Sequence, residues 1–161
     1  MMTGIKSVPD NLSVYYLLLS CTLFLFIAAL GPGLYHADIS QLTAAHYSLF
    51  AHLCHQDPAR TFVFMGEPMA VCSRCIGIYI GAFSATILLP VLSLIPEIKK
   101  KWELYLFGFA TVLNFIDLGG NYIGIWTNTL YSRLVLGILF GLASITLLNR
   151  TFFKSKNTEI S

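Results

Sequence analysis

The chain has 161 residues, of which 56% are hydrophobic and only 11% are charged. Soluble proteins carry about 25% charged residues, so this composition excludes a soluble enzyme and a disordered chain. The net charge of +2 is too small and too dispersed for a nucleic-acid-binding surface. Four spans of ~20 residues would use about half of the chain. We therefore expect an all-α polytopic protein of the cell membrane, in contact with the lipid bilayer.

The first apolar segment covers residues 14–35 and contains no charged residue. It is long enough to cross a bilayer, and Gly31-Pro32-Gly33 marks its end. A cleaved signal peptide is the alternative, but the apolar core of a signal peptide has only about 7–15 residues. The segment is predicted to be a transmembrane helix.

Three further apolar segments follow, and the first two of them end at residues that favour a turn. The third of the four spans is expected to stop at Gly119-Gly120. With the first segment they predict four transmembrane helices in a single membrane domain, residues 1–161, with one long loop at residues 36–75. The three further spans are predicted at residues 76–95, 102–118 and 130–148.

The basic residues predict the orientation. Cytoplasmic segments of membrane proteins carry an excess of Lys and Arg. A cytoplasmic N-terminus with four spans would place seven of the ten basic residues on the cytoplasmic side. We therefore expect both termini in the cytoplasm and the long loop on the outer face. The seven are Lys6, Lys99, Lys100, Lys101, Arg150, Lys154 and Lys156.

The long loop is predicted to contain a helix and a hairpin. Apolar residues recur at intervals of three and four over residues 39–55, which is typical of an amphipathic helix. The segment is too polar to span the membrane, so we expect an interfacial helix. A short hairpin around Gly66-Glu67-Pro68 would then carry Cys54 back toward Cys72 and Cys75.

These three cysteines are the candidate functional residues. Cys72 and Cys75 lie three residues apart at a helix entry, a spacing that suits two ligands of one metal ion. A zinc site needs about four ligands, and Cys54, His55, Cys72 and Cys75 would supply them, with His52 as the alternate histidine. Zinc or another transition metal is the expected ion.

Two alternatives remain open for the thiols. A helix N-terminus lowers the pKa of a thiol, so the Cys72–Cys75 pair also suits a membrane thiol–disulfide oxidoreductase, with a quinone as electron acceptor. Alternatively, the cysteines form a structural disulfide or stay buried as thiols. No phosphate loop, Ser-His-Asp order or HExxH motif is present, so the sequence assigns no catalytic residue.

Polar residues and glycines recur at helical spacing in the later spans. Asn114, Asp117 and Asn121 share one helix face, and Arg133 opens the last helix. Ionisable groups at membrane depth are usually paired, so we expect an Asp117–Arg133 ion pair. Two small-xxx-small faces, Gly77-x-x-x-Gly81 and Gly137-x-x-x-Gly141, predict close helix packing.

The motifs C-H-Q at 54–56, R-T-F at 60–62 and C-x-R-C-x-G-I-Y-x-G at 72–81 occur in this order. Together they resemble the domain of unknown function 2085 family of small prokaryotic membrane proteins, over residues 45–145. The resemblance implies a multi-pass membrane protein and no particular activity. Downstream, Asp117, Asn128 and Arg133 also match the family pattern, and the polar positions of the pattern are expected to surround the thiols as a supporting pocket. These positions are Gln56, Arg60, Arg74, Asp117, Asn128 and Arg133.

Overall fold

The computed structural model describes residues 12–34, 40–92 and 102–152. Most of these residues are helical, as the composition predicts. The helices are α1 (Leu12–Leu30), the 3-10 turn η1 (Gly31–Leu34), α2 (Ser40–Phe50), the 3-10 turn η2 (Pro58–Arg60), α3 (Ser73–Leu92), α4 (Trp102–Ile123) and α5 (Leu130–Phe152). Two short strands, β1 (Val63–Phe64) and β2 (Glu67–Pro68), complete the elements.

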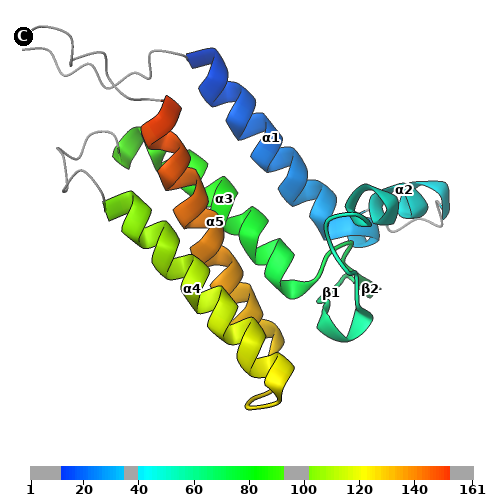
Figure 1. The fold of residues 1–161 in the computed structure, drawn as a ribbon. Coiled ribbons are helices and arrows are strands. Elements are labelled where there is room, and N and C mark those ends of the chain that lie inside the picture. The colour runs from blue at the N-terminus through cyan, green and yellow to red at the C-terminus, as the bar shows by residue number, and fades with distance from the viewer. Residues whose placement is uncertain (1–11, 35–39, 93–101, 153–161) are drawn as a thin grey trace, which may run out of the picture.

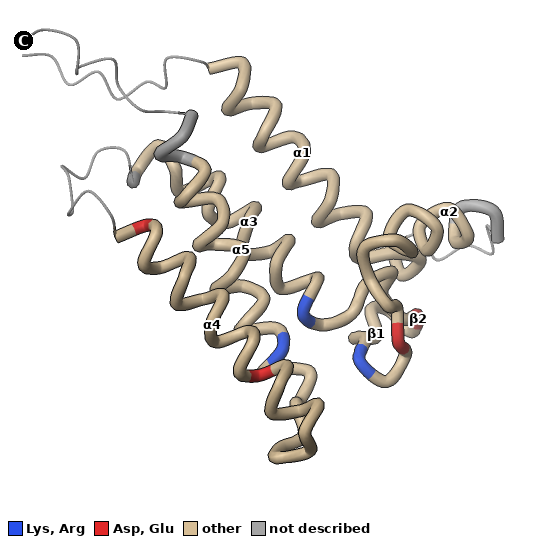
Figure 2. Tube along the Cα trace, in the orientation of Figure 1, with Lys and Arg blue, Asp and Glu red and all other residues tan. Residues whose placement is uncertain are grey.

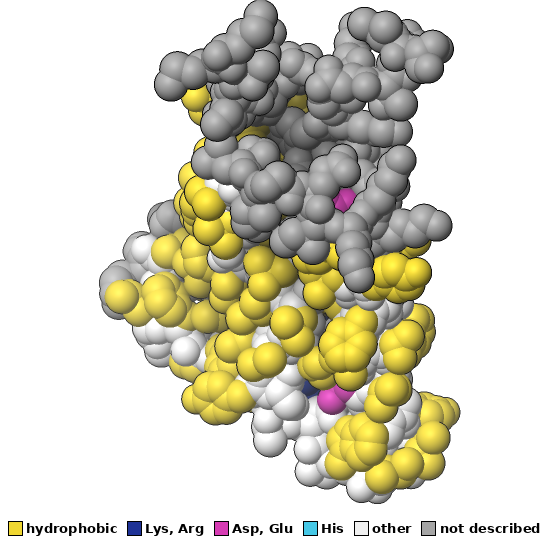
Figure 3. Space-filling view, turned by 90° about the vertical axis from the view of Figure 1, so that its left-hand side faces the viewer, with side chains coloured by type: hydrophobic (Ala, Val, Ile, Leu, Met, Phe, Trp, Pro, Cys, Tyr) yellow, Lys and Arg dark blue, Asp and Glu magenta, His cyan; other side chains and the backbone are white. Residues whose placement is uncertain are grey.

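The long helices α1, α3, α4 and α5 form the body of the molecule (Figure 1). Helix α3 packs against both α1 and α5, and α4 packs against α5. Helix α2 and the two strands gather at one end of the bundle, beside the C-terminal end of α1 and the N-terminal end of α3 (Figure 1). Most of the visible described surface is apolar (Figure 3).

Within the described residues, three helices are long and apolar enough to cross a membrane: Leu12–Leu34, Ser73–Val91 and Leu130–Leu148. They coincide with the first, second and fourth predicted spans. Helix α4 is not among them, although it has 22 residues. Its two acidic residues, two asparagines and two adjacent glycines lower its average hydropathy. The prediction of four spans is therefore confirmed only for three helices.

The contact between α3 and α5 depends on glycine at four positions. A methyl group at Gly77 or Gly81 would collide with the backbone carbonyl of Leu134 or Ile138, respectively. In return, Gly137 and Gly141 lie against the carbonyls of Arg74 and Ile78. The predicted close packing at the two small-residue faces is confirmed, and the two faces meet each other.

Helix α4 continues beyond the point predicted from the sequence. It passes through Gly119-Gly120 and ends at Ile123, so the predicted end near residue 118 is wrong. The Trp126 indole lies against Gly120, where any side chain would collide with the ring. The helix stops at Gly124, whose φ of 80° is left-handed, and the Ile125 N–H returns to the Gly120 carbonyl at 2.9 Å. This is the Schellman arrangement of a helix C-terminus.

The long loop contains the predicted helix and hairpin. Helix α2 ends at Phe50, earlier than predicted, because the chain turns there to bring Cys54 into the interior. Strands β1 and β2 pair antiparallel, with Phe64 opposite Glu67. Met65 and Gly66 join them with positive φ angles of 51° and 91°, which is typical of a two-residue type I′ turn. The lysines used to predict the orientation lie outside the described residues.

Candidate metal centre

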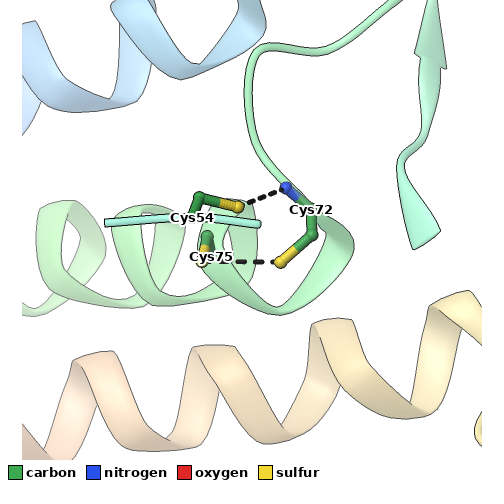
Figure 4. Close-up of side chains that lie close together, drawn as sticks. All are labelled: Cys54, Cys72 and Cys75. Atoms are coloured by element: carbon green, nitrogen blue, oxygen red, sulfur yellow. Dashed lines mark hydrogen bonds between the residues drawn. The ribbon is translucent and has the colours of Figure 1, made fainter. Parts of the chain in front are cut away.

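The three candidate cysteines meet where the long loop enters α3 (Figure 4). Cys54 follows α2, Cys72 immediately precedes α3, and Cys75 lies in its first turn. Their sulfurs all lie within 4.8 Å of one another. The Sγ atoms of Cys72 and Cys75 are 3.5 Å apart, and the Cys72 N–H donates to the Cys54 sulfur at 3.2 Å. The three side chains are free thiols.

Gln56 holds the loop in the conformation that brings Cys54 inward. Its side-chain amide donates to the carbonyl of Tyr47 in α2 at 2.6 Å and to that of Ala70 at 3.1 Å. Its own backbone is left-handed, with φ of 49°. One side chain thus joins the end of α2 to the segment that leads into Cys72. Gln56, a motif position, therefore holds in place the two backbone segments that carry Cys54 and Cys72.

Tyr47 also holds this loop in place, and it is not among the residues predicted from the sequence. Its hydroxyl donates to the carbonyl of Pro68 in β2 at 3.1 Å. The acceptors of Gln56 and Tyr47 are backbone carbonyls, which every residue type carries. The sequence therefore contained no signal for these partners.

Apolar side chains enclose the three thiols. Phe50, Val71 and Ile76 are buried next to Cys54. The cluster also includes Ala28 and Ala29 of α1. A thiolate in such surroundings is costly unless a charge or a hydrogen bond compensates it. A bound cation would supply that compensation.

The Cys72 thiol loses its proton more readily than an ordinary cysteine thiol. The hydrogen bond with the Cys54 thiol, followed by that with Cys75, lowers the pKa of the Cys72 thiol below its usual value. The thiolate is the form of cysteine that binds metals and attacks disulfides. The arrangement therefore suits both metal binding and thiol chemistry.

The structure places the candidate histidines away from the sulfurs. His52 and His55 are both exposed, and neither belongs to the three-thiol group found among the described residues. Three of the four proposed metal ligands thus lie together. The assignment of His55 as the fourth ligand stays a prediction.

The predicted Asp117–Arg133 ion pair is wrong. Asp117 instead accepts hydrogen bonds from Arg74 of α3 and from the side chain of Asn128, at 2.5 and 2.7 Å. Asn128 is oriented by its backbone N–H, which donates to Asn121 at 3.1 Å. Arg74 reaches α4 because α3 and α5 approach closely at their glycines. A polar network next to the thiols therefore joins α3, α4 and the loop before α5.

Arg60 lies farther out than the sequence predicts. It forms an ion pair with Asp57 at 3.0 Å, and its side chain is about half exposed. Arg60 thus belongs to the surface of the loop. Of the supporting residues, Arg74 and Asn128 both contact Asp117 directly.

Comparison with known proteins identifies the family. The family described as "Predicted membrane protein (DUF2085)" matches residues 54–147, which include all three cysteines, the Arg74–Asp117 pair and the four packed glycines. The chain belongs to this family. It is a membrane protein, as its three apolar helices also indicate.

Two relatives of the chain are themselves uncharacterised. An uncharacterised protein of Methanocaldococcus jannaschii is 26% identical over 149 residues, covering 87% of this chain and 94% of the relative. An uncharacterised protein of Methanothermobacter thermautotrophicus is 44% identical over 29% of this chain and 55% of its own length. No solved structure matches the chain.

Proposed function

We propose that this membrane protein binds one transition-metal ion through Cys54, Cys72 and Cys75. The observation that carries the proposal is the convergence of three sulfurs within 4.8 Å from two separate parts of the chain. Zinc–thiolate bonds of about 2.3 Å in a tetrahedral site separate the sulfurs by roughly 3.8 Å. The Cys72–Cys75 separation of 3.5 Å is close to that value.

The ligand chemistry favours zinc or another thiophilic ion. Thiolates select such ions, whereas magnesium and calcium prefer oxygen ligands. His55 is the proposed fourth ligand because it belongs to the C-H-Q motif at residues 54–56. Its imidazole is exposed, so it would have to turn inward when the metal binds.

Elemental analysis of the purified protein tests the proposal. We expect about one metal ion per chain in protein purified in detergent under reducing conditions. Substitution of Ser for Cys54, Cys72 or Cys75 should remove most of it, because each thiolate supplies one bond. Cys21 provides a matched control, since it is an exposed cysteine in α1, and Cys21→Ser should retain the metal. Metal-free wild-type protein after incubation with zinc would contradict the proposal.

A thiol–disulfide oxidoreductase is the second candidate, and the short Cys72–Cys75 separation favours it. A disulfide bond of about 2.05 Å requires these sulfurs to approach by roughly 1.5 Å from their present 3.5 Å. Closing it would release two protons and two electrons, which a quinone would accept. This candidate predicts a Cys72–Cys75 disulfide that forms when a quinone analogue is added. It also predicts no stoichiometric metal.

We infer that α4 is a fourth transmembrane helix. Its 22 residues extend over about 33 Å, enough to cross the hydrocarbon core. Asp117, the acidic residue in the C-terminal half of α4, is paired with Arg74. The exposed face of α4 is apolar along its whole length, as expected for contact with lipid. It consists of Leu104, Tyr105, Phe109, Val112, Phe115, Ile116, Leu118, Tyr122 and Ile123.

Four spans with cytoplasmic termini would place the thiol centre on the outer face of the cell membrane. The support for this orientation is the excess of basic residues in the segments assigned to the cytoplasm. Helix α2 would then lie at the outer membrane interface, in the single membrane domain of residues 1–161.

A further inference from the structure

The end of the bundle that holds the thiols contains an uncompensated positive charge. The structure describes the side chains of three arginines: Arg60, Arg74 and Arg133. Arg60 pairs with Asp57 and Arg74 pairs with Asp117. The guanidinium of Arg133 has no hydrogen bond or ion pair within the described part of the chain, and its Nε is buried. Arg133 is therefore free to bind a ligand.

Charged groups of both signs surround Arg133, but none of those described forms an ion pair with it. The charged groups that act on it are the cations Arg60 and Arg74 and, with opposite sign, Asp117 and Cys72. The described basic positions all lie at this end of the bundle, together with acidic positions near the hairpin and one acidic position of α4 (Figure 2). Since Asp117 already neutralises Arg74, the charge of Arg133 remains. An arginine in a partly buried setting at the membrane is costly unless a negative group compensates it.

The same region contains other polar atoms without a partner. Arg74 Nε and Asn128 Oδ1 are both buried and make no hydrogen bond among the described residues. Both side chains also contact Asp117, so they belong to one site. One atom is a donor and the other is an acceptor. Acidic and basic atoms are visible side by side in a small opening of the apolar surface (Figure 3).

We propose that Arg133, together with Arg74, binds a phosphate group beside the thiol centre. The planar guanidinium donates two parallel hydrogen bonds to phosphate oxygens. Arg133 lies in the first turn of α5, where the positive end of the helix dipole also favours an anion. The open acceptor on Asn128 suits a ligand with a hydroxyl besides its charge. Free hydrogen phosphate and the glycerol phosphate headgroup of phosphatidylglycerol both have this chemistry. The inference does not depend on metal binding at the cysteines.

Binding measurements on the full-length protein test the site. One arm titrates inorganic phosphate into detergent-solubilised protein and follows its thermal stability. The other compares stability in nanodiscs of phosphatidylcholine alone with nanodiscs that contain phosphatidylglycerol. Arg133→Gln should weaken the response at least about tenfold, because a charge-assisted bidentate contact is lost. Arg150→Gln is the control, because this arginine lies near the opposite end of the same helix.

The two arms distinguish the two sources of phosphate. An Arg133-dependent response to inorganic phosphate supports a free ligand, and a response confined to phosphatidylglycerol supports a lipid headgroup. Equal responses of wild type and Arg133→Gln in both arms overturn the proposal.

If Arg133→Gln does not fold, chemical labelling of arginine in the wild-type protein tests whether phosphate binds at Arg133. Phenylglyoxal should modify Arg133, and the effective phosphate source should protect it by at least about tenfold in rate. Unchanged labelling with either source overturns the proposal. The same protection in Cys54→Ser would show that phosphate binding persists when the metal centre is lost.

Discussion

Asp117 is the polar centre of the described helices. Its carboxylate receives hydrogen bonds from Arg74 and Asn128, and its side chain is 13% exposed. Arg74 in turn has a side chain that is 23% exposed. Solvent therefore screens this pair only weakly, and removal of one partner would leave a charge without compensation.

A double-mutant cycle measures the strength of this pair. We expect Arg74→Gln and Asp117→Asn each to reduce the free energy of unfolding by about 1–3 kcal/mol. The double variant should lose less than the sum of the two, because no unpaired charge remains. Apparent unfolding in detergent is the measurement. The exposed Arg60–Asp57 pair should show a coupling below about 1 kcal/mol. Additive losses at Arg74 and Asp117 would mean that the two side chains act separately.

Gln56 connects the shape of the loop to the proposed metal centre. Gln56→Ala removes both of its hydrogen bonds, to Tyr47 and Ala70, and leaves the three thiols unchanged. We expect the metal dissociation constant to rise by about 10–100-fold, the usual effect of removing a group that orients ligands. Competition with a chromogenic chelator measures it. Ser48→Ala in the same loop is a control, because its hydroxyl is exposed and bonds within α2.

At the level of residues, spacing predicted the thiol cluster but not the partner of Asp117. Cys72 and Cys75 are three apart, and the turn at Gly66 makes the return of Cys54 predictable. Arg74 and Arg133 both lie at helix entries, so the sequence offers two equivalent partners for Asp117. Which arginine pairs with Asp117 depends on how closely α3 and α5 approach each other, and the packed glycines determine that distance.

At the level of elements, the contact between α3 and α5 should be the most sensitive to added volume. Gly81→Ala would place a methyl group against the Ile138 carbonyl, and the helices would have to separate. We expect a loss of about 1–3 kcal/mol in the free energy of unfolding. Gly108 lies in α4 with open space around it, so Gly108→Ala should be neutral or stabilising by up to about 1 kcal/mol. Equal effects of the two changes would contradict the close contact.

The C-terminal end of α4 shows that a tertiary contact can overrule a local sequence signal for a helix end. Adjacent glycines at 119 and 120 favour a helix end, yet α4 continues because the Trp126 ring packs where Gly120 has no side chain. This contact spans six residues and includes a turn, so periodicity does not reveal it. The hairpin was predictable because its signal is local, but its turn lies at Met65-Gly66, whereas Glu67 and Pro68, which were predicted to form part of the turn, form β2.

At the level of the whole molecule, hydropathy predicted three of the spans but leaves α4 undecided. Asn114 and Asp117 lower its hydropathy, although both side chains bond within the protein. Asn114 donates to the Leu136 carbonyl of α5 at 3.2 Å, and Asp117 pairs with Arg74. A helix that satisfies its polar groups against its neighbours can face lipid with its remaining surface. The average hydropathy of a helix does not take such contacts into account.

The number of spans determines whether the two termini lie on the same side of the membrane. If α4 crosses, the chain has four spans and both ends face the cytoplasm. If α4 does not cross, three spans place them on opposite sides. A fluorescent protein that matures only in the cytoplasm should therefore give signal when fused at residue 1 or, separately, at residue 161.

Fusions inside the chain provide the control for this topology. A fusion truncated after Gly66 should be dark with the cytoplasmic reporter and active with alkaline phosphatase, which requires export. The Gly66 position suits the test because it is exposed at the hairpin turn. Fluorescence at residue 1 without fluorescence at residue 161 would show that α4 does not span. Fluorescence after Gly66 would place the thiol centre on the cytoplasmic side, because Cys54 and Cys72 flank the hairpin.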